Sequence, residues 1–466
     1  MRISVANKIY VEHATQAVFD WCSKNLEFPN PEYAKKREMG KWLGDTQPTI
    51  VLWERRGETA ILPHGCFVDF MRFTNTCPAQ MIIPEKDEYQ EIQYNSHIEL
   101  FDYQRKAAKA AFGCSGVLVM PCGSGKTQTA LQLVAEYKKR TLWLTHTQEL
   151  LNQSKERALS CFDIDEDKIG TITAGKVDVG EAITFATVQT MASVDLEPYK
   201  EYWDVVIVDE CHKAVGTPTK LMMFYKVVSQ LTASIKLGLT ATPKRNDGLE
   251  RCMYALLGPQ LYEVPESAVA ANTVPINVFM KEDTSYDVDV EYFCNPDGTV
   301  NYNKVMDLLC ECEPRNRMIA ETVNSVNSGG FTCLVLSDRV QHLTELRKLV
   351  GEDYTMQIFS TSGSKKARQA RKDCIQRLKE KKIRCLFATY QLAKEGLDIP
   401  SLDCVVFATP KKDPITIVQS CGRVGRKAPG KAFGTVIDIV DKSFPIFDGY
   451  AKKRKNIYKN KKYFTF

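Results

Sequence analysis

The chain has 466 residues, of which 44% are hydrophobic and 26% are charged, and its formal net charge is +5 at pH 7. This length predicts about three domains with real apolar cores. No run of about eighteen apolar residues occurs, and the first residues lack the apolar stretch of a secretion signal. The sixteen cysteines are scattered and form no CxxC pair. We expect an intracellular globular protein without a membrane span or a disulfide framework.

Residues 1–95 alternate short apolar and polar runs, as in TIVLWERRGETAILPHG, where apolar flanks surround a turn-prone Arg-Arg-Gly-Glu. This alternation is typical of short strands that bury one face. It predicts a small α+β domain at the N-terminus.

Two later segments, 96–262 and 316–445, show a different pattern, in which fully apolar strands alternate with helical stretches. Such strands belong to parallel sheets that are covered by helices on both faces. Two α/β domains in tandem are therefore expected. The predicted strands are SGVLVM, RTLWLTH, AITFATV, WDVVIVDE and IKLGLTAT in the first domain, and FTCLVLS, IRCLFAT, LDCVVFAT and AFGTVIDIV in the second.

Two further segments lack this pattern. Residues 263–315 are polar and rich in turn formers, so we expect a linker with an insertion. Residues 446–466 form a basic tail, in which lysines and arginines are interleaved with Tyr450, Tyr458, Tyr463 and Phe464. Such a tail either neutralises phosphates and stacks on bases or is a solvated, frayed C-terminus.

The stretch PCGSGKTQ follows an apolar strand and opens a helical pattern. In this context glycines let backbone N–H groups surround a phosphate at the start of the helix. Lys126 would neutralise the β- and γ-phosphates of a nucleotide, and Thr127 would hold Mg²⁺. Val119 stands where the eight-residue motif has its first glycine, so the motif alone is weak. The candidate phosphate-binding residues are Gly123, Ser124, Gly125, Lys126 and Thr127.

An acidic pair follows the buried strand in WDVVIVDECHKA. Asp209 stands where a carboxylate reaches Mg²⁺, and the adjacent Glu210 is placed to activate the attacking water as a general base. An acidic pair that merely caps a loop is the commoner alternative. The phosphate loop upstream favours the Mg²⁺-binding and general-base interpretation over loop capping.

A pair of arginines, Arg423 and Arg426, lies in QSCGRVGRKAPGK. Their spacing of three predicts that they share one helix face. Two guanidinium groups suit the charge that spreads over the oxygens of a transferring γ-phosphate. Because they belong to the second α/β domain, we expect the nucleotide to bind between the two domains and to drive their closure.

The ordered set FDYQ, PCGSGKTQ, LTHTQELLNQ, FATVQTM, VDECH, LTATP, LVLSDR, FATYQLAKEGLDIP and QSCGRVGR resembles the motifs of superfamily 2 helicases over residues 97–440. The Asp-Glu-Cys-His box and the Thr-Ala-Thr segment resemble the DNA branch that contains XPB, RecG and phage UvsW. The resemblance implies two RecA-like domains that use ATP and Mg²⁺.

The resemblance also implies roles for single residues. Gln104 would read adenine, and His212 would couple the γ-phosphate to the second domain. Gln419 would lie near the attacking water, while Gly396 and Asp398 would sense nucleotide and strand together. The residues expected to hold nucleic acid by phosphate or sugar, with little base specificity, are Thr147, Gln189, Ser337, Arg339 and Thr389.

The resemblance implies an ATP-dependent DNA helicase that unwinds or branch-migrates forked or junction DNA in repair, recombination or replication. The compact size would suit a phage or viral origin, and the source is left open. The N-terminal domain resembles small duplex-binding domains, and its basic stretch YAKKREMGKW (33–42) either contacts a duplex or is a solvated helix face. An RNA helicase, a duplex translocase and an ATP-gated clamp are the alternatives. A monomer fits, but the oligomeric state is left open.

Overall fold

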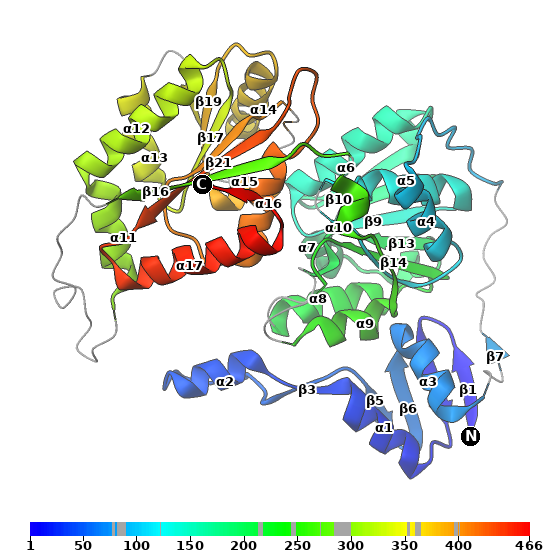
Figure 1. Cartoon of the computed structure of the whole chain (residues 1–466). Helices are drawn as coiled ribbons and strands as arrows, with labels where there is room; N and C mark the ends of the chain where they lie inside the picture. The colour runs from blue at the N-terminus through cyan, green and yellow to red at the C-terminus, as the bar shows by residue number, and fades with distance from the viewer. Residues whose placement is uncertain are drawn as a thin grey trace. The chain divides into compact units, whose positions relative to one another are not determined.

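The computed structural model describes residues 1–466 except for 77–79, 82–89, 122, 213–217, 244–247, 271, 284–299, 352–354, 359–364, 396–398 and 400. It divides into two compact units, Met1–Ala268 (unit 1) and Val269–Phe466 (unit 2). Figure 1 shows their elements in chain order. No helix in the described part of the chain has the length and apolar character that a membrane span needs.

Unit 1 begins with the expected small α+β domain. Its five-stranded sheet has the order β5-β6-β2-β1-β7, antiparallel except that β7 joins β1 in parallel, and a separate two-stranded sheet pairs β3 with β4. In β2 the buried Ile9 and Val11 alternate with partly exposed residues, as the sequence pattern predicts. The elements are β1 (Arg2–Val5), β2 (Lys8–Glu12), α1 (Gln16–Leu26), β3 (Glu27–Pro29), α2 (Pro31–Glu38), β4 (Thr49–Val51), β5 (Glu54–Arg56), β6 (Thr59–Pro63), α3 (Phe67–Thr74) and β7 (Gln80–Met81).

The rest of unit 1 is built on an eight-stranded sheet in the order β11-β10-β12-β9-β13-β14-β8-β15, parallel except at the β10–β11 pair. Every residue of the strands β8, β9, β12, β13 and β14, which form within the five predicted apolar stretches, is buried, so both faces are covered, as expected. The strands are β8 (Gly116–Val119), β9 (Thr141–Thr145), β10 (Ile169–Thr173), β11 (Lys176–Asp178), β12 (Ile183–Thr187), β13 (Val205–Val208), β14 (Ile235–Thr240) and β15 (Gln260–Glu263). The helices are α4 (Asp102–Ala111), α5 (Lys126–Tyr137), α6 (Gln148–Cys161), α7 (Val188–Ser193), α8 (Pro218–Val228), α9 (Glu250–Leu257) and α10 (Glu266–Ala270).

Unit 2 contains a seven-stranded parallel sheet in the order β18-β19-β17-β20-β21-β16-β22. One face packs against α12 and α13, and the other packs against α14 to α17 (Figure 1). The strands are β16 (Ile276–Asp283), β17 (Cys333–Ser337), β18 (Thr355–Ile358), β19 (Cys385–Thr389), β20 (Cys404–Phe407), β21 (Gly434–Asp441) and β22 (Phe464–Thr465). The helices are α11 (Tyr302–Glu311), α12 (Glu313–Ser328), α13 (Val340–Val350), α14 (Lys365–Lys379), α15 (Tyr390–Glu395), α16 (Pro414–Val424) and α17 (Pro445–Asn460).

Two expected boundaries are wrong. Within the expected linker at 263–315, β16 pairs with β21 along its whole length and belongs to the second sheet. The expected tail at 446–466 forms α17 and β22, and β22 adds to the edge of the same sheet. Phe447, Ala451 and Tyr458 give α17 a buried face while its lysines stay outside, which is the physical reason that this basic segment does not fray. Tyr458 is fully buried and therefore cannot stack on a base.

A buried arginine anchors α17 to the sheet. Arg454 Nε lies 2.7 Å from Asp438 Oδ2, and its NH1 donates to the carbonyl oxygen of Lys411 at 2.9 Å. The hydroxyl of Tyr458 donates to the same Asp438 oxygen at 2.8 Å. Both charged groups are almost completely removed from water, so each one depends on the other.

Replacing Arg454 by leucine should therefore destabilise unit 2, because Asp438 would be left buried without its cation. We expect a loss of ~3–5 kcal/mol in the free energy of unfolding, seen as a fall of about 6 °C or more in the melting temperature. The exposed neighbour Lys455→Ala should melt like the wild type, and adding Asp438→Leu to Arg454→Leu should recover most of the loss. Equal melting of Arg454→Leu and wild type would contradict this account.

A buried lysine lies where the N-terminal domain packs against α8 and α9. Lys236 Nζ donates to the carbonyl oxygens of Val228 at 3.1 Å and of Asn7 at 3.4 Å. Gly65 belongs to the same contact, since a Cβ there would lie 2.5 Å from the backbone of Tyr254 and Gly258. Burial lowers the pKa of Lys236 from 10.5 to about 7.

This pKa predicts a stability that rises with pH. Between about 7 and 10.5 the unfolded chain binds more protons at this position than the folded chain, so the free energy of unfolding increases across that window. Urea titrations at the two ends of the window should show a clear gain for the wild type and a smaller gain for Lys236→Met. The exposed Lys226→Met is the matched control. A pH slope that survives Lys236→Met unchanged would refute the assignment.

Candidate functional site

The predicted phosphate loop connects β8 to α5 in unit 1, and residues 123–127 are described. Gly123 has φ +80° and Gly125 has φ +76°, conformations that glycine adopts without strain. A Cβ on Gly123 would meet nothing within 4 Å, so the loop leaves open space there. Gly125 is the N-cap of α5 and no side chain caps the first turn. The loop therefore presents backbone N–H groups at a helix N-terminus, which suits a phosphate.

The acidic pair meets this loop. Asp209 follows β13 directly, and its backbone N–H donates to the carbonyl oxygen of Leu144 in β9. Glu210 Oε1 lies 3.0 Å from Lys126 Nζ, so the structure brings together the loop cation and the candidate base. Glu210 has φ +49°, an uncommon conformation for a residue with a side chain. Asp209 Oδ1 helps to hold it by accepting the Glu210 backbone N–H at 2.9 Å.

His212 lies beside this pair and is buried. Its Nδ1 is 2.9 Å from Thr240 Oγ1 and 3.3 Å from Glu210 Oε2. The same Thr240 hydroxyl accepts the backbone N–H of Thr242 at 3.1 Å. The histidine thus connects the acidic pair after β13 to Thr240, which ends β14 and opens the Thr-Ala-Thr segment.

Gln104, which is expected to read adenine, contacts the phosphate loop in this structure. Its Nε2 donates to the carbonyl oxygen of Ser124 at 2.9 Å, and its Oε1 accepts the backbone N–H of Phe101 at 2.8 Å. The side chain is buried, and a Cβ on Gly125 would come within 2.3 Å of its Nε2. In this structure the amide positions the phosphate loop, and adenine recognition stays a prediction. The capping contact to Phe101 is what sequence reasoning missed, although Gln104 stands at the N3 position of α4.

The two strand-contact candidates of unit 1 lie at the same edge of the sheet. Thr147 follows β9 and caps α6, its Oγ1 accepting the Leu150 N–H at 3.3 Å. Gln189 follows the neighbouring β12, and its Nε2 donates to the carbonyl oxygen of His146 at 2.9 Å. Because β9 and β12 are parallel, both residues stand at the carboxyl ends of adjacent strands.

In unit 2 the corresponding residues also end adjacent parallel strands. Ser337 ends β17 and is buried, its Oγ accepting the Arg339 N–H at 3.1 Å, while Thr389 ends β19. The Arg339 guanidinium is engaged by α11, with Nε 2.9 Å from Asp307 Oδ1 and NH2 2.9 Å from Asn303 Oδ1. No local pattern in the sequence predicts this contact with an acidic residue, and a strand contact by Arg339 stays a prediction.

The arginine pair is placed differently from the prediction. Arg423 lies in α16, and its NH2 donates to the carbonyl oxygen of Ala393 at 2.6 Å. The helix ends at Val424, and Arg426 forms an antiparallel bridge with Thr273 instead. The expected common helix face is therefore wrong, because the Val274 N–H captures the Gly425 carbonyl and draws the chain toward β16.

Three other candidates complete the set. Gln419 is buried in α16, and its Oε1 has no hydrogen-bond partner among the described residues. Gly396 and Asp398 lie outside the described residues. No group of three or more metal-ligating His, Cys, Asp or Glu side chains occurs in the part of the chain that the structure describes.

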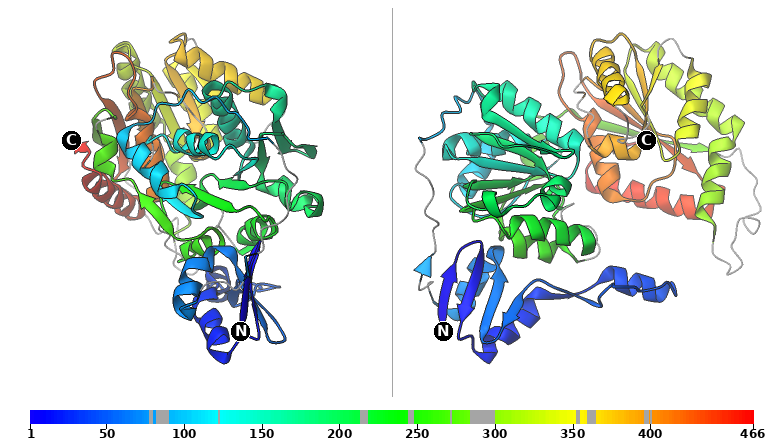
Figure 2. Two further views of the ribbon diagram at one scale, coloured as in Figure 1. Left: turned by 90° about the vertical axis from the view of Figure 1, so that its right-hand side faces the viewer. Right: turned by 180° about the vertical axis from the view of Figure 1, so that it is seen from behind.

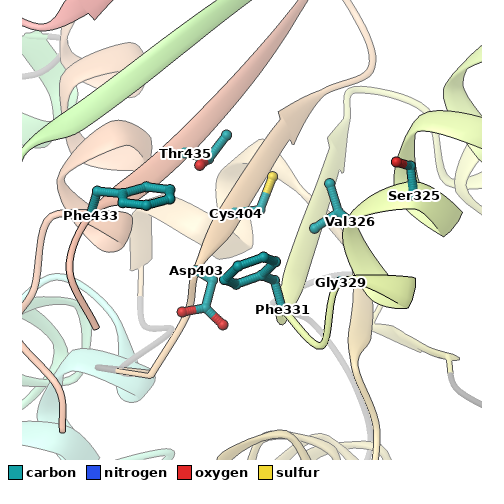
Figure 3. Close-up of a pocket in the computed structure, with 8 residues that line it drawn as sticks. All are labelled: Ser325, Val326, Gly329, Phe331, Asp403, Cys404, Phe433 and Thr435. Atoms are coloured by element: carbon teal, nitrogen blue, oxygen red, sulfur yellow. The ribbon is translucent and has the colours of Figure 1, made fainter. Parts of the chain in front are cut away.

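A pocket in unit 2 lies away from these residues (Figure 3). Asp403 and Thr435 stand at the amino ends of β20 and β21, whereas Ser337 and Thr389 stand at the carboxyl ends of their strands. The pocket is therefore on the opposite edge of the parallel sheet and does not belong to the candidate site. It is lined by Ser325, Val326, Gly329, Phe331, Asp403, Cys404, Phe433 and Thr435.

Two protein-family models match segments of this chain. The model of the type III restriction enzyme res subunit matches residues 85–245, and that of the helicase conserved C-terminal domain matches residues 315–428. These segments contain the phosphate loop, the acidic pair and both arginines.

Individual proteins agree with the family models. The chain is 28% identical over 358 residues to a putative ATP-dependent RNA helicase of Acanthamoeba polyphaga mimivirus, covering 75% of this chain and 65% of that one. It is 26% identical over 374 residues to the DNA 3'-5' translocase XPB2 of Sulfurisphaera tokodaii, covering 74% of this chain and 82% of that one. The chain thus spans just under two thirds of the length of the viral relative.

A solved structure supports the fold. S. cerevisiae Dbp5 bound to RNA and ADP BeF3 aligns with a TM-score of 0.55 at 14% identity, covering 79% of this chain and 90% of that one. The two tandem parallel-sheet domains are therefore RecA-like, as expected. Together with the family models, these matches show that the chain belongs to the superfamily 2 helicases and is related to XPB.

Proposed function

We propose that the chain is an ATP-dependent helicase that couples ATP hydrolysis to movement along DNA and to unwinding or branch migration of forked or junction DNA. The observation that carries the proposal is the 3.0 Å contact between Lys126 and Glu210. It brings the cation of a phosphate loop to the carboxylate best suited to activate water. The family to which the chain belongs supports the same activity.

ATP with Mg²⁺ fits the residues that are present. The loop offers backbone N–H groups at the start of α5, and Ser124 Oγ is buried without a hydrogen-bond partner among the described residues. Asp209 and Thr127 would supply the oxygen ligands that Mg²⁺ prefers. When bound, ATP supplies the phosphoanhydride bond whose hydrolysis releases free energy.

The chain's own groups then have separate tasks. Lys126 neutralises phosphate charge, and Glu210 accepts a proton from the attacking water. In this structure the two groups form an ion pair, and a bound phosphate would compete with Glu210 for Lys126, so that Glu210 could act as a base. His212 contacts the other carboxylate oxygen of Glu210, and Thr240 in turn contacts His212.

Unit 2 would supply the remaining groups. Arg423 and Arg426 stabilise the charge that develops on the γ-phosphate, and Gln419 orients the attacking water. The side-chain amide oxygen of Gln419 has no hydrogen-bond partner among the described residues, so it could accept a hydrogen bond from that water. Gly396 and Asp398 keep their expected role as sensors of nucleotide and strand.

DNA is the proposed substrate because the relative from Sulfurisphaera tokodaii is a DNA translocase. RNA is the second candidate, since the mimivirus relative is described as a putative RNA helicase. The residues proposed to contact the strand are hydroxyls, an amide and one arginine, which bind phosphate and sugar without reading bases. An ATP-gated clamp has the weakest support, because a protein that need not hydrolyse ATP has no use for Glu210.

The substrate assignment predicts how nucleic acids stimulate ATP hydrolysis. Forked DNA should raise the steady-state rate with Mg²⁺ by about tenfold or more over protein alone. Single-stranded DNA and blunt duplex should stimulate less, and a fork of the same sequence made of RNA should stimulate least. Lys126→Met serves as the control for contaminating hydrolysis and should be inactive with every substrate.

The other outcomes discriminate among the alternatives. Equal or greater stimulation by the RNA fork would replace DNA by RNA. Stimulation by blunt duplex without strand separation would favour a duplex translocase. Binding of ATP without hydrolysis under all conditions would favour the clamp.

A further inference from the structure

The N-terminal domain carries a projecting segment, residues 27–51, which we call the arm. It consists of β3, α2 and β4, and its two-stranded sheet is separate from the five-stranded sheet of the domain. Figures 1 and 2 show α2 extending away from the strands β5 and β6. No residue of α2 is buried, so this helix adds nothing to a hydrophobic core.

The arm is nevertheless well defined by local hydrogen bonds. Asn30 Oδ1 accepts the backbone N–H of Glu32 at 3.0 Å, and its Nδ2 donates to the carbonyl oxygen of Gln47 at 2.7 Å. Lys36 Nζ donates to Thr46 Oγ1 at 2.7 Å, which connects the helix to the returning chain. Phe28 and Ile50 anchor the base of the arm in the core, whereas residues 31–49 are held in one shape without a buried side chain and so present their side chains to solvent.

The side chain presented most openly is a tryptophan. Trp42 is 88% exposed, and nearby Met39 is 55% exposed, whereas tryptophan is usually highly buried. Gly44, with φ +51°, lies close to the indole, because a Cβ there would be 2.9 Å from the ring. The ring therefore lies close to the backbone at Gly44 and leaves most of its surface exposed to solvent.

Exposed cations lie close to this tryptophan in the sequence. Lys35, Arg37 and Lys41 are all exposed and lie within seven residues of one another. An aromatic face beside exposed cations matches single-stranded nucleic acid, which offers stacking bases and phosphates in succession. In a duplex both faces of each base are covered by its neighbours, so a projecting indole finds a base only where the strands are unpaired.

We propose that the arm binds single-stranded nucleic acid at a branch point, with Trp42 stacked on an unpaired base and Lys35, Arg37 and Lys41 on the adjoining phosphates. The proposal rests on the proposed function, since it names a substrate contact of the same helicase. It gives the N-terminal domain a preference for unpaired bases in place of a duplex contact.

The test compares Trp42→Leu with the wild type in the full chain, without ATP. Fluorescence anisotropy with a labelled oligothymidylate should show about tenfold weaker binding, the effect of losing one stacked base. Binding to a blunt duplex should not change, and Trp42→Phe should keep most of the affinity. Phe112→Leu is the matched control, because Phe112 is also exposed in unit 1 but lies outside the arm.

Two further measurements separate stacking from charge and from misfolding. Trp143 and Trp203 are buried, Trp21 and Trp53 are partly buried, and Trp42 is exposed, so the part of the tryptophan quenching by the oligothymidylate that comes from Trp42 should be lost in Trp42→Phe. The triple variant Lys35→Gln/Arg37→Gln/Lys41→Gln should lower the slope of log affinity against log salt by about 2. Equal affinity, quenching and salt slope in all these variants would overturn the proposal.

The failure of this inference is distinguishable from the failure of the proposed function. Nucleic-acid-stimulated hydrolysis in the wild type, together with normal binding by every arm variant, would reject strand binding by the arm and support the proposed helicase activity. Binding that depends on Trp42, together with absent hydrolysis, would keep the arm as a strand-binding element and remove the motor.

Discussion

The ion pair between Lys126 and Glu210 is the contact on which the candidate site depends. It connects a loop after β8 to a carboxylate after β13, and these strands are separated in the sheet by β14 alone. Parallel strands bring their carboxyl ends to one edge, so the fold itself delivers both groups to the same place. Glu210 accepts an uncommon backbone conformation there, which Asp209, Lys126 and His212 together stabilise.

The same edge gathers the other candidates of unit 1. Gln104 fastens the phosphate loop from one side, and Thr147 and Gln189 stand farther along the sheet after β9 and β12. The residues proposed for nucleotide chemistry and those proposed for strand contacts are thereby attached to one sheet. His212 contacts both Glu210 and Thr240, so a movement of Glu210 would be transmitted to the end of β14.

Unit 2 depends on buried ion pairs as well as apolar packing. Arg315 is fully buried with Asp441, and Arg454 is buried with Asp438, so the helices α12 and α17 are fixed at defined positions on the sheet. Burial of this kind specifies an arrangement, because a shifted helix would leave a charge unpaired. The basic segment near the end of the chain is therefore part of the fold, and its exposed lysines are carried by a well-anchored helix.

Sequence reasoning found the central strands and the segments that carry the candidate site because those signals are local. Fully apolar strands such as β8 and β13 and the glycine-rich loop after β8 are visible as short patterns. The strand β16 was missed because its burial alternates irregularly and resembles a polar linker. The contacts of Arg454 and Arg339 join residues far apart in the chain, and no local pattern announces them. Arg426 was predicted to lie in the same helix as Arg423, but α16 ends at Val424, where the next carbonyl oxygen, that of Gly425, accepts the backbone N–H of Val274.

The most direct measurement of the central claim is nucleotide binding and hydrolysis by Glu210→Gln. If Glu210 is the base that Lys126 neutralises in the free protein, the variant should bind ATP as tightly as the wild type or more tightly. Its hydrolysis should fall by about 10²–10⁴-fold, the usual contribution of a general base. Glu197→Gln, which changes an exposed glutamate in the same unit, should leave both quantities unchanged. Hydrolysis by Glu210→Gln within a few-fold of the wild type would contradict the account.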